Sequence, residues 1–224
     1  MPRTRFQESQ SHAEDGVRLL SSRVDKAVAD AMESLRTRNM TLARAVVDGD
    51  EEVNARRYEL EEEVLQMMAT QAPVASDLRE SVSILSIVAD LERIGDHAEG
   101  IARIALFLGD ETIASTEPEL WVMADKVRRM LRNSIESFLN RNEAMARATC
   151  DLDDEVDEIY DRVHRHVIQQ LSGLPLDARE FDGYTHLLWT SHNLERIGDR
   201  ATNICERAIF LVTGKLEEIN VSRY

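Results

Sequence analysis

The chain has 224 residues, of which 43% are hydrophobic and 31% charged, and its formal net charge is −15. Nucleic-acid affinity depends on clustered lysine and arginine, so this charge argues against nucleic-acid binding and favours cations and basic protein surfaces. The longest apolar runs have about five residues, whereas a membrane-spanning helix needs about 20. The first residues have no apolar run after their basic residues, so a secretory leader is not expected. We therefore expect a cytoplasmic protein without direct membrane insertion.

Helical periodicity runs almost from end to end, and glycine or proline marks most of its interruptions. Asp50 and Asp153 stand where the caps of the second and fifth helices are expected. No strand is expected, so the predicted fold class is all-α. The breaks predict six helices, at about residues 6–47, 51–70, 74–109, 117–149, 153–172 and 177–213.

The chain matches itself at an offset of 103 residues, which carries Glu92 onto Glu195 and Asp50 onto Asp153. Eleven of the eighteen residues from 91 to 108 are identical to those from 194 to 211, where ordinary composition would give about one. Such repetition predicts two tandem three-helix bundles that arose by internal duplication. We place the first repeat at residues 1–112 and the second at 113–224.

A six-residue motif on each third helix is the part that the repeats share most closely. Residues 91–96 recur unchanged as 194–199, although several neighbours differ. Glu92 and Asp96 share one helix face, as do Glu195 and Asp199, because they are four residues apart. Like charges at this spacing cost an isolated helix about 0.2–0.5 kcal/mol. A partner is therefore expected to offset the repulsion.

A metal ion is one candidate for that partner. Asp157 and Asp161 repeat the spacing on the fifth predicted helix, where the first repeat has Asn54 and Tyr58. Carboxylates on facing helices suit hard or borderline cations, and helix bundles often build metal sites in this way. The sequence leaves iron, zinc, manganese and magnesium open. The candidate ligands are Glu92, Asp96, Glu195, Asp199, Asp157, Asp161 and Asp90, which precedes the first motif on a different flank.

Two other interpretations stay open. Arg93 and Arg196 could pair with the carboxylates three residues later, so that the motif only solvates a helix surface. A carboxylate-bridged metal store or di-metal enzyme is the other alternative. Ferritin-like di-iron proteins use Glu-x-x-His on two helices, and this chain has no such sequence. It also lacks a glycine-rich phosphate loop and a nucleophile–base signature, so we do not expect an enzyme.

The motif is also recognisable as that of a known family. Leu-Glu-Arg-Ile-Gly-Asp-His-Ala in the first repeat, Asn-Leu-Glu-Arg-Ile-Gly-Asp-Arg-Ala in the second, and the segment Thr70 to Arg79 resemble the PhoU family. The resemblance covers essentially the whole chain. It implies a cytoplasmic negative regulator of phosphate uptake and of the phosphate-starvation two-component response.

The resemblance further implies partners and a site. The partners are the ATPase of the phosphate ABC transporter and the phosphate-sensing histidine kinase, and a homodimer is expected. The family's Glu/Asp-x-x-x-Asp motif binds metal clusters in some members. It carries over here to Glu92 with Asp96 and to Glu195 with Asp199, while the pair at 157 and 161 fits the same spacing.

Overall fold

The structure is a computed structural model that describes residues 2–109, 117–173 and 177–219, with side chains from residue 6 onward. All regular elements in these ranges are α-helices, which confirms the all-α prediction. Their bounds are α1 Pro2–Thr37, α2 Met40–Gln71, α3 Ser76–Leu108, α4 Glu119–Leu139, α5 Glu143–Cys150, α6 Asp153–Gly173 and α7 Ala178–Thr213.

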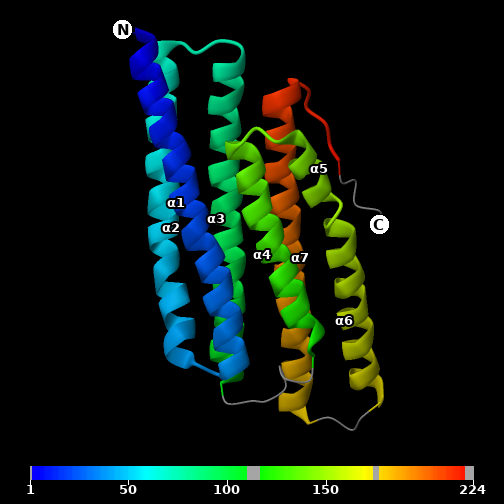
Figure 1. Ribbon diagram of the computed structural model, residues 1–224. Helices are drawn as coiled ribbons and strands as arrows, with labels where there is room; N and C mark the ends of the chain where they lie inside the picture. Colours follow the sequence, from blue (N-terminus) through cyan, green and yellow to red (C-terminus); the bar gives the residue numbers. More distant parts are fainter. Residues whose placement is uncertain (1, 110–116, 174–176, 220–224) are drawn as a thin grey trace.

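The two repeats form two bundles that lie side by side (Figure 1). The first contains α1, α2 and α3, and the second contains α4, α5, α6 and α7. Helix α3 packs along α7, and α1 packs along α4, so buried side chains of both bundles form one core. The predicted tandem bundles are confirmed, whereas the predicted boundary between residues 112 and 113 lies outside the described residues.

The first break of the chain differs from the prediction. Helix α1 ends at Thr37 rather than near residue 47, and Asp50 lies inside α2 instead of capping it. The turn is made by Arg38, with φ of 56°, and by Asn39, whose side chain accepts the N–H of Leu42 at 3.0 Å. An interior glycine costs a helix only about 1 kcal/mol. The glycine at residue 49 is therefore tolerated in the middle of α2.

The second repeat contains the same turn. Arg141 has φ of 51°, and the Asn142 side chain accepts the N–H of Met145 at 3.0 Å. Both residues lie 103 positions after Arg38 and Asn39. The helix predicted over 117–149 is therefore divided into α4 and α5. The break before residue 153 is present, and the acidic first turn of α6, beginning at Asp153, complements the helix dipole.

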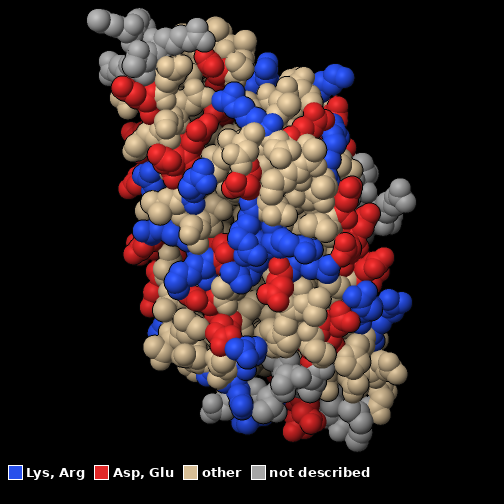
Figure 2. Space-filling model, viewed as in Figure 1, with Lys and Arg blue, Asp and Glu red and all other residues tan. Residues whose placement is uncertain are grey.

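Charged side chains join the bundles where α1 meets α4. Figure 2 shows a band of basic residues across the middle of this face. Arg128 binds Asp25 through two hydrogen bonds, from Nε to Oδ1 at 2.9 Å and from Nη2 to Oδ2 at 3.0 Å. Arg132 adds a third contact to the same carboxylate at 3.2 Å. These bonds connect the first repeat directly to the second.

The described end of the chain folds back along α7. Residues 214–219, which we call the C-terminal segment, begin at Gly214 with φ of 73°. The backbone N–H of Ile219 donates to Glu206 Oε1 at 2.8 Å, and Arg147 of α5 binds Glu217 at 3.1 Å. None of the helices in the described ranges is both long and apolar enough to cross a membrane.

Candidate functional site

The motif of the first repeat faces α2. Gly95 lies between Glu92 and Asp96, and it lets α3 approach α2 closely. A Cβ atom on this glycine would lie 3.1 Å from Val53 Cγ1 and 3.4 Å from Asp50 Oδ1. The close approach therefore brings a third carboxylate, from the neighbouring helix, beside the two of the motif.

The first cluster concentrates negative charge in a partly buried place. Oδ1 of Asp50 is buried without a hydrogen-bond partner among the described atoms, while Asn54 Nδ2 donates to Oδ2 at 2.8 Å. Burial, followed by the charges of Asp96, Glu99 and Glu92, raises the pKa of Asp50. Burial also raises the pKa of Glu92, and the charge of Asp96 adds to the shift. A bound cation would relieve this repulsion.

The second repeat repeats this geometry against α6. A Cβ on Gly198 would lie 3.0 Å from Asp153 Oδ1, so the first carboxylate of α6 sits beside the motif. Burial, reinforced by the charge of Asp199, raises the pKa of Glu195 to about 7. Burial and the same aspartate also raise the pKa of Asp157. The clusters are thus alike, but the second has a carboxylate at 157 where the first has an amide.

Arginines within the motif bind part of this charge. Arg93 donates to Asp96 at 2.8 Å and lies 3.4 Å from Glu92. Arg196 donates to Asp199 at 3.1 Å. The helical-surface pairing predicted as an alternative to metal is therefore present. Arg196 Nε also lies 3.5 Å from the buried Oε2 of Glu195, which makes no hydrogen bond with the described atoms.

The structure sorts the predicted ligands into groups. Glu92 lies with Asp96, and Glu195 lies with Asp199 and Asp157. Asp161 is exposed one turn further along α6, and its charge still reaches the carboxyl group at 157. Asp90 lies apart from both clusters. It faces the junction of α3 and α7, where Arg200 and Asn203 donate to its Oδ1 at 3.4 and 3.3 Å.

Sequence reasoning missed the roles of Asp50 and Asp153, which it assigned to helix caps. The repeat carried a usable signal, because both aspartates are retained at the same offset as Gly95 and Gly198. In the described part of the chain, no set of three His, Cys, Asp or Glu side chains is arranged to hold a metal ion. A cation bound here would therefore take several ligands from water or from another molecule.

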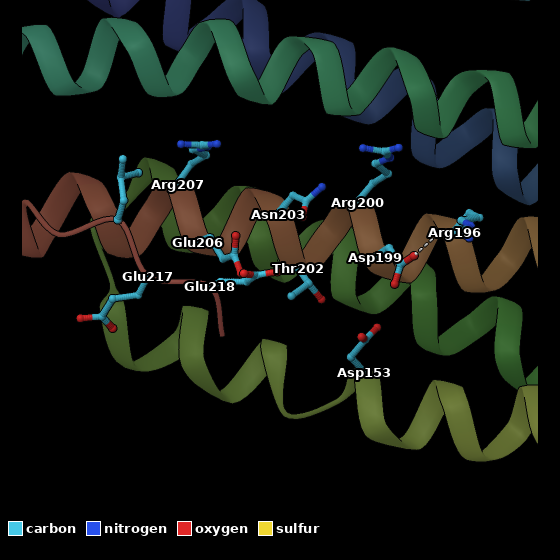
Figure 3. A pocket seen from close by; sticks show the side chains of 11 residues that line it. Asp153, Arg196, Asp199, Arg200, Thr202, Asn203, Glu206, Arg207, Glu217 and Glu218 are labelled. Atoms are coloured by element: carbon cyan, nitrogen blue, oxygen red, sulfur yellow. Dashed lines mark hydrogen bonds and ion pairs between the residues drawn. The ribbon is translucent and has the colours of Figure 1, made fainter. Parts of the chain in front are cut away.

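A groove of about 580 Å³ adjoins the second cluster and runs along α7 (Figure 3). Arg200 and Arg207 lie on its α3 side, while Asp153 of α6 and the C-terminal segment lie on the other. The groove is therefore lined by basic groups on one side and acidic groups on the other. Its lining residues are Asp153, Arg196, Asp199, Arg200, Thr202, Asn203, Glu206, Arg207, Leu216, Glu217 and Glu218.

Comparison with protein families gives two matches to the PhoU domain model, at residues 17–105 and 120–208. The chain belongs to the PhoU family. The two matched ranges are offset by the 103 residues seen in the repeat, so the family domain corresponds to one repeat.

Relatives and solved structures of this family resemble the chain over nearly its full length. A phosphate-specific transport system accessory protein PhoU homolog of Clostridium acetobutylicum is 35% identical over 90% of this chain and 91% of its own. A Caulobacter vibrioides homolog is 33% identical over 97% and 93%. The crystal structure of PhoU from Pseudomonas aeruginosa superposes with a TM-score of 0.86 at 30% identity, covering 94% of this chain and 100% of that one.

The phosphate transport system regulatory protein PhoU from Streptococcus pneumoniae also has a TM-score of 0.86. It is 29% identical and covers 95% of this chain and 99% of its own. These agreements confirm the family resemblance inferred from the motif and the predicted tandem-bundle fold.

Proposed function

We propose that this chain is a cytoplasmic accessory protein that regulates phosphate-specific transport and restrains the phosphate-starvation response. The observation that carries the proposal is the full-length match to accessory proteins of that transport system, with both PhoU domains present. In this proposal the chain contacts the ATPase of the phosphate ABC transporter and the cytoplasmic part of the phosphate-sensing histidine kinase. It acts as a homodimer and without catalysis.

Such an adaptor must distinguish two states of a partner, because binding both states equally would shift no equilibrium. The net charge of −15 favours basic partner surfaces. The two bundles, joined through one core, provide a rigid body that could contact the transporter and the kinase at separate places.

We further propose that each carboxylate cluster binds a divalent or trivalent cation. The support is the pair of acidic motifs, each joined by an aspartate from a neighbouring helix and each with pKa values raised by burial and mutual repulsion. Iron, zinc, manganese and magnesium are the candidates. The alternative function, metal storage or di-metal chemistry, is not favoured, because the relatives that match the chain are named as accessory proteins of phosphate-specific transport.

The test of the adaptor role uses the purified full-length chain with the transporter ATPase and the cytoplasmic kinase fragment of the same organism. Binding is measured by interferometry, with the ATPase in its ATP-bound and ADP-bound states. We expect saturable binding to both partners and an affinity that differs between the nucleotide states by about fivefold or more. Absence of binding to either partner would overturn the adaptor mechanism.

A further inference from the structure

The groove along α7 contains a row of arginines that the first repeat lacks. Arg200 and Arg207 lie on the α3 side of the groove (Figure 3), and seven residues of helix separate them by about 10 Å. Their equivalents in the first repeat are His97 and Ile104. The row is therefore particular to the second repeat, and the shared motif does not account for it.

Both guanidinium groups retain unused hydrogen-bonding capacity. Among the described residues, Arg207 makes no hydrogen bond or close ion pair, although its charge acts on Asp90 and Glu206. Nε of Arg200 is buried without a partner, and another nitrogen of this group reaches Asp90 only at 3.4 Å. A buried donor without an acceptor is costly. Because guanidinium groups match phosphate oxygens in a forked geometry, an oxyanion is the ligand that suits this wall.

The acidic side of the groove, opposite Arg200 and Arg207, indicates that an oxyanion binds together with a cation. Five carboxylates line the groove against three arginines, so a free anion would be repelled. Asp199 of α7 and Asp153, at the start of α6 after the turn from α5, both contribute to the lining. Mg²⁺ usually binds through one or two carboxylates plus the phosphates of a ligand, and keeps several waters. A magnesium-bound phosphate therefore complements both walls.

We propose that this groove binds an oligophosphate together with Mg²⁺. Arg200 and Arg207 hold the phosphate oxygens, and Asp199 with Asp153 holds the cation. A linear chain of phosphates suits two arginines about 10 Å apart better than a single phosphate does. A volume of about 580 Å³ is typical of small-ligand pockets. Pyrophosphate, tripolyphosphate and nucleoside triphosphates share this chemistry.

This inference deepens the proposed function, because an oligophosphate would report the phosphate status of the cell. The signalling role of the ligand rests on the proposed function. Binding itself needs neither the transporter nor the kinase. If the wild-type chain binds its protein partners but no oligophosphate, this inference falls and the adaptor proposal stands. If the chain binds an oligophosphate but no protein partner, the adaptor proposal falls and this inference stands.

The experiment is isothermal titration calorimetry on the purified full-length chain. Tripolyphosphate, ATP and orthophosphate are titrated separately, each with Mg²⁺ and again with the cation chelated. We expect one saturable site per chain that requires Mg²⁺ and binds tripolyphosphate or ATP at least about tenfold more tightly than orthophosphate. The better of the two ligands identifies the inorganic or the nucleotide source. Equal binding without Mg²⁺, or orthophosphate binding as tightly, would overturn the proposal.

Substitutions in the groove test whether the oligophosphate binding measured by calorimetry occurs there. Arg207→Gln should weaken binding about tenfold or more, because it removes hydrogen bonds to a charged ligand without breaking any bond in the free protein. Asp199→Asn should weaken it at limiting Mg²⁺. The matched control is Arg103→Gln on α3, which removes an arginine that binds Glu99 outside the groove. Wild-type affinity in Arg207→Gln, with an unchanged melting temperature, would contradict the assignment.

Discussion

Asp25 of α1 and Arg128 of α4 occupy the same position of the two repeats and bind each other through two hydrogen bonds of 2.9 and 3.0 Å. An identical pair of repeats would place two like residues opposite each other here. The charges instead differ in sign. A second exchange occurs between α3 and α7, where Asp90 meets Arg200 and the equivalent residues, Asn193 and His97, meet at 3.0 Å. Divergence after duplication has therefore made the two halves complementary.

The first prediction concerns this pair. Asp25→Ala should lower the free energy of unfolding by about 1–2 kcal/mol, because it leaves Arg128 and Arg132 facing each other without a counter-charge. The exchanged double variant, Asp25→Arg with Arg128→Asp, should recover part of that loss. Urea unfolding followed by circular dichroism measures both. If the double variant loses as much free energy of unfolding as Asp25→Arg and Arg128→Asp lose together, the pair contributes no specific coupling.

The second prediction compares a closely packed helical glycine, Gly198, with one in open space, Gly49. Gly198→Ala should destabilise the protein by about 1 kcal/mol, since crowding costs about 1–3 kcal/mol and helix propensity returns about 1. The crowding arises because the added Cβ would lie 3.0 Å from Asp153 Oδ1. Gly49→Ala, in open space within α2, is the control and should stabilise the protein by about 1 kcal/mol. Equal effects would show that close packing is not the reason for Gly198.

The third prediction concerns pH. Burial and the charge of Asp199 raise the pKa of Glu195 from 4.5 to about 7. The folded chain therefore holds this proton where the unfolded chain has lost it, and stability from this group falls as the pH rises from about 4.5 to 7. Glu195→Gln should raise the melting temperature above pH 7 in chelator, by roughly 2–4 °C for each kcal/mol regained.

A control for the pH prediction has the opposite sign. Lys126 lowers the pKa of Glu155 through a hydrogen bond and its charge, so this group adds stability above its ordinary pKa and loses it in acid. Glu155→Gln should therefore leave the protein no more stable at pH 8. A rise in melting temperature in both variants would point to a general relief of net negative charge rather than to Glu195 itself.

The fourth prediction compares the two clusters as cation sites. Asn54 of the first repeat occupies the position of Asp157 in the second. Asn54→Asp should raise the affinity of the first cluster for Mn²⁺, because it adds a carboxylate beside Asp50. Equilibrium dialysis with Mn²⁺ measures the change, with Asp161→Asn as a comparison at an exposed position. Unchanged affinity in the Asn54 variant would contradict a metal site that includes α2.

The sequence predicted the helical class, the duplication and the pairing of Glu92 with Asp96, because helical spacing alone places those carboxylates on one face. It missed the turn at Arg38 and Asn39, which contains neither glycine nor proline and depends on a left-handed residue and a side-chain cap. The predicted break was placed at Gly49 instead. That glycine lies in open space within α2, and local propensity alone cannot show that the helix continues through it.

The sites depended on tertiary contacts that spacing could not supply. Asp50 and Asp153 join the motifs only because Gly95 and Gly198 let neighbouring helices approach. The position of Asp90 at the junction of α3 and α7 likewise follows from how the bundles pack. The groove needs residues from α6, α7 and the C-terminal segment together, so sequence periodicity along one helix could not reveal it.

The most direct test of the central claim is a phosphatase reporter for the starvation response, measured in phosphate-rich native cells with the gene present, deleted and restored. A restraining regulator predicts that deletion switches the reporter on and that the wild-type gene switches it off again. A reporter that stays silent after deletion, in cells without a second PhoU-family gene, would contradict the proposed function.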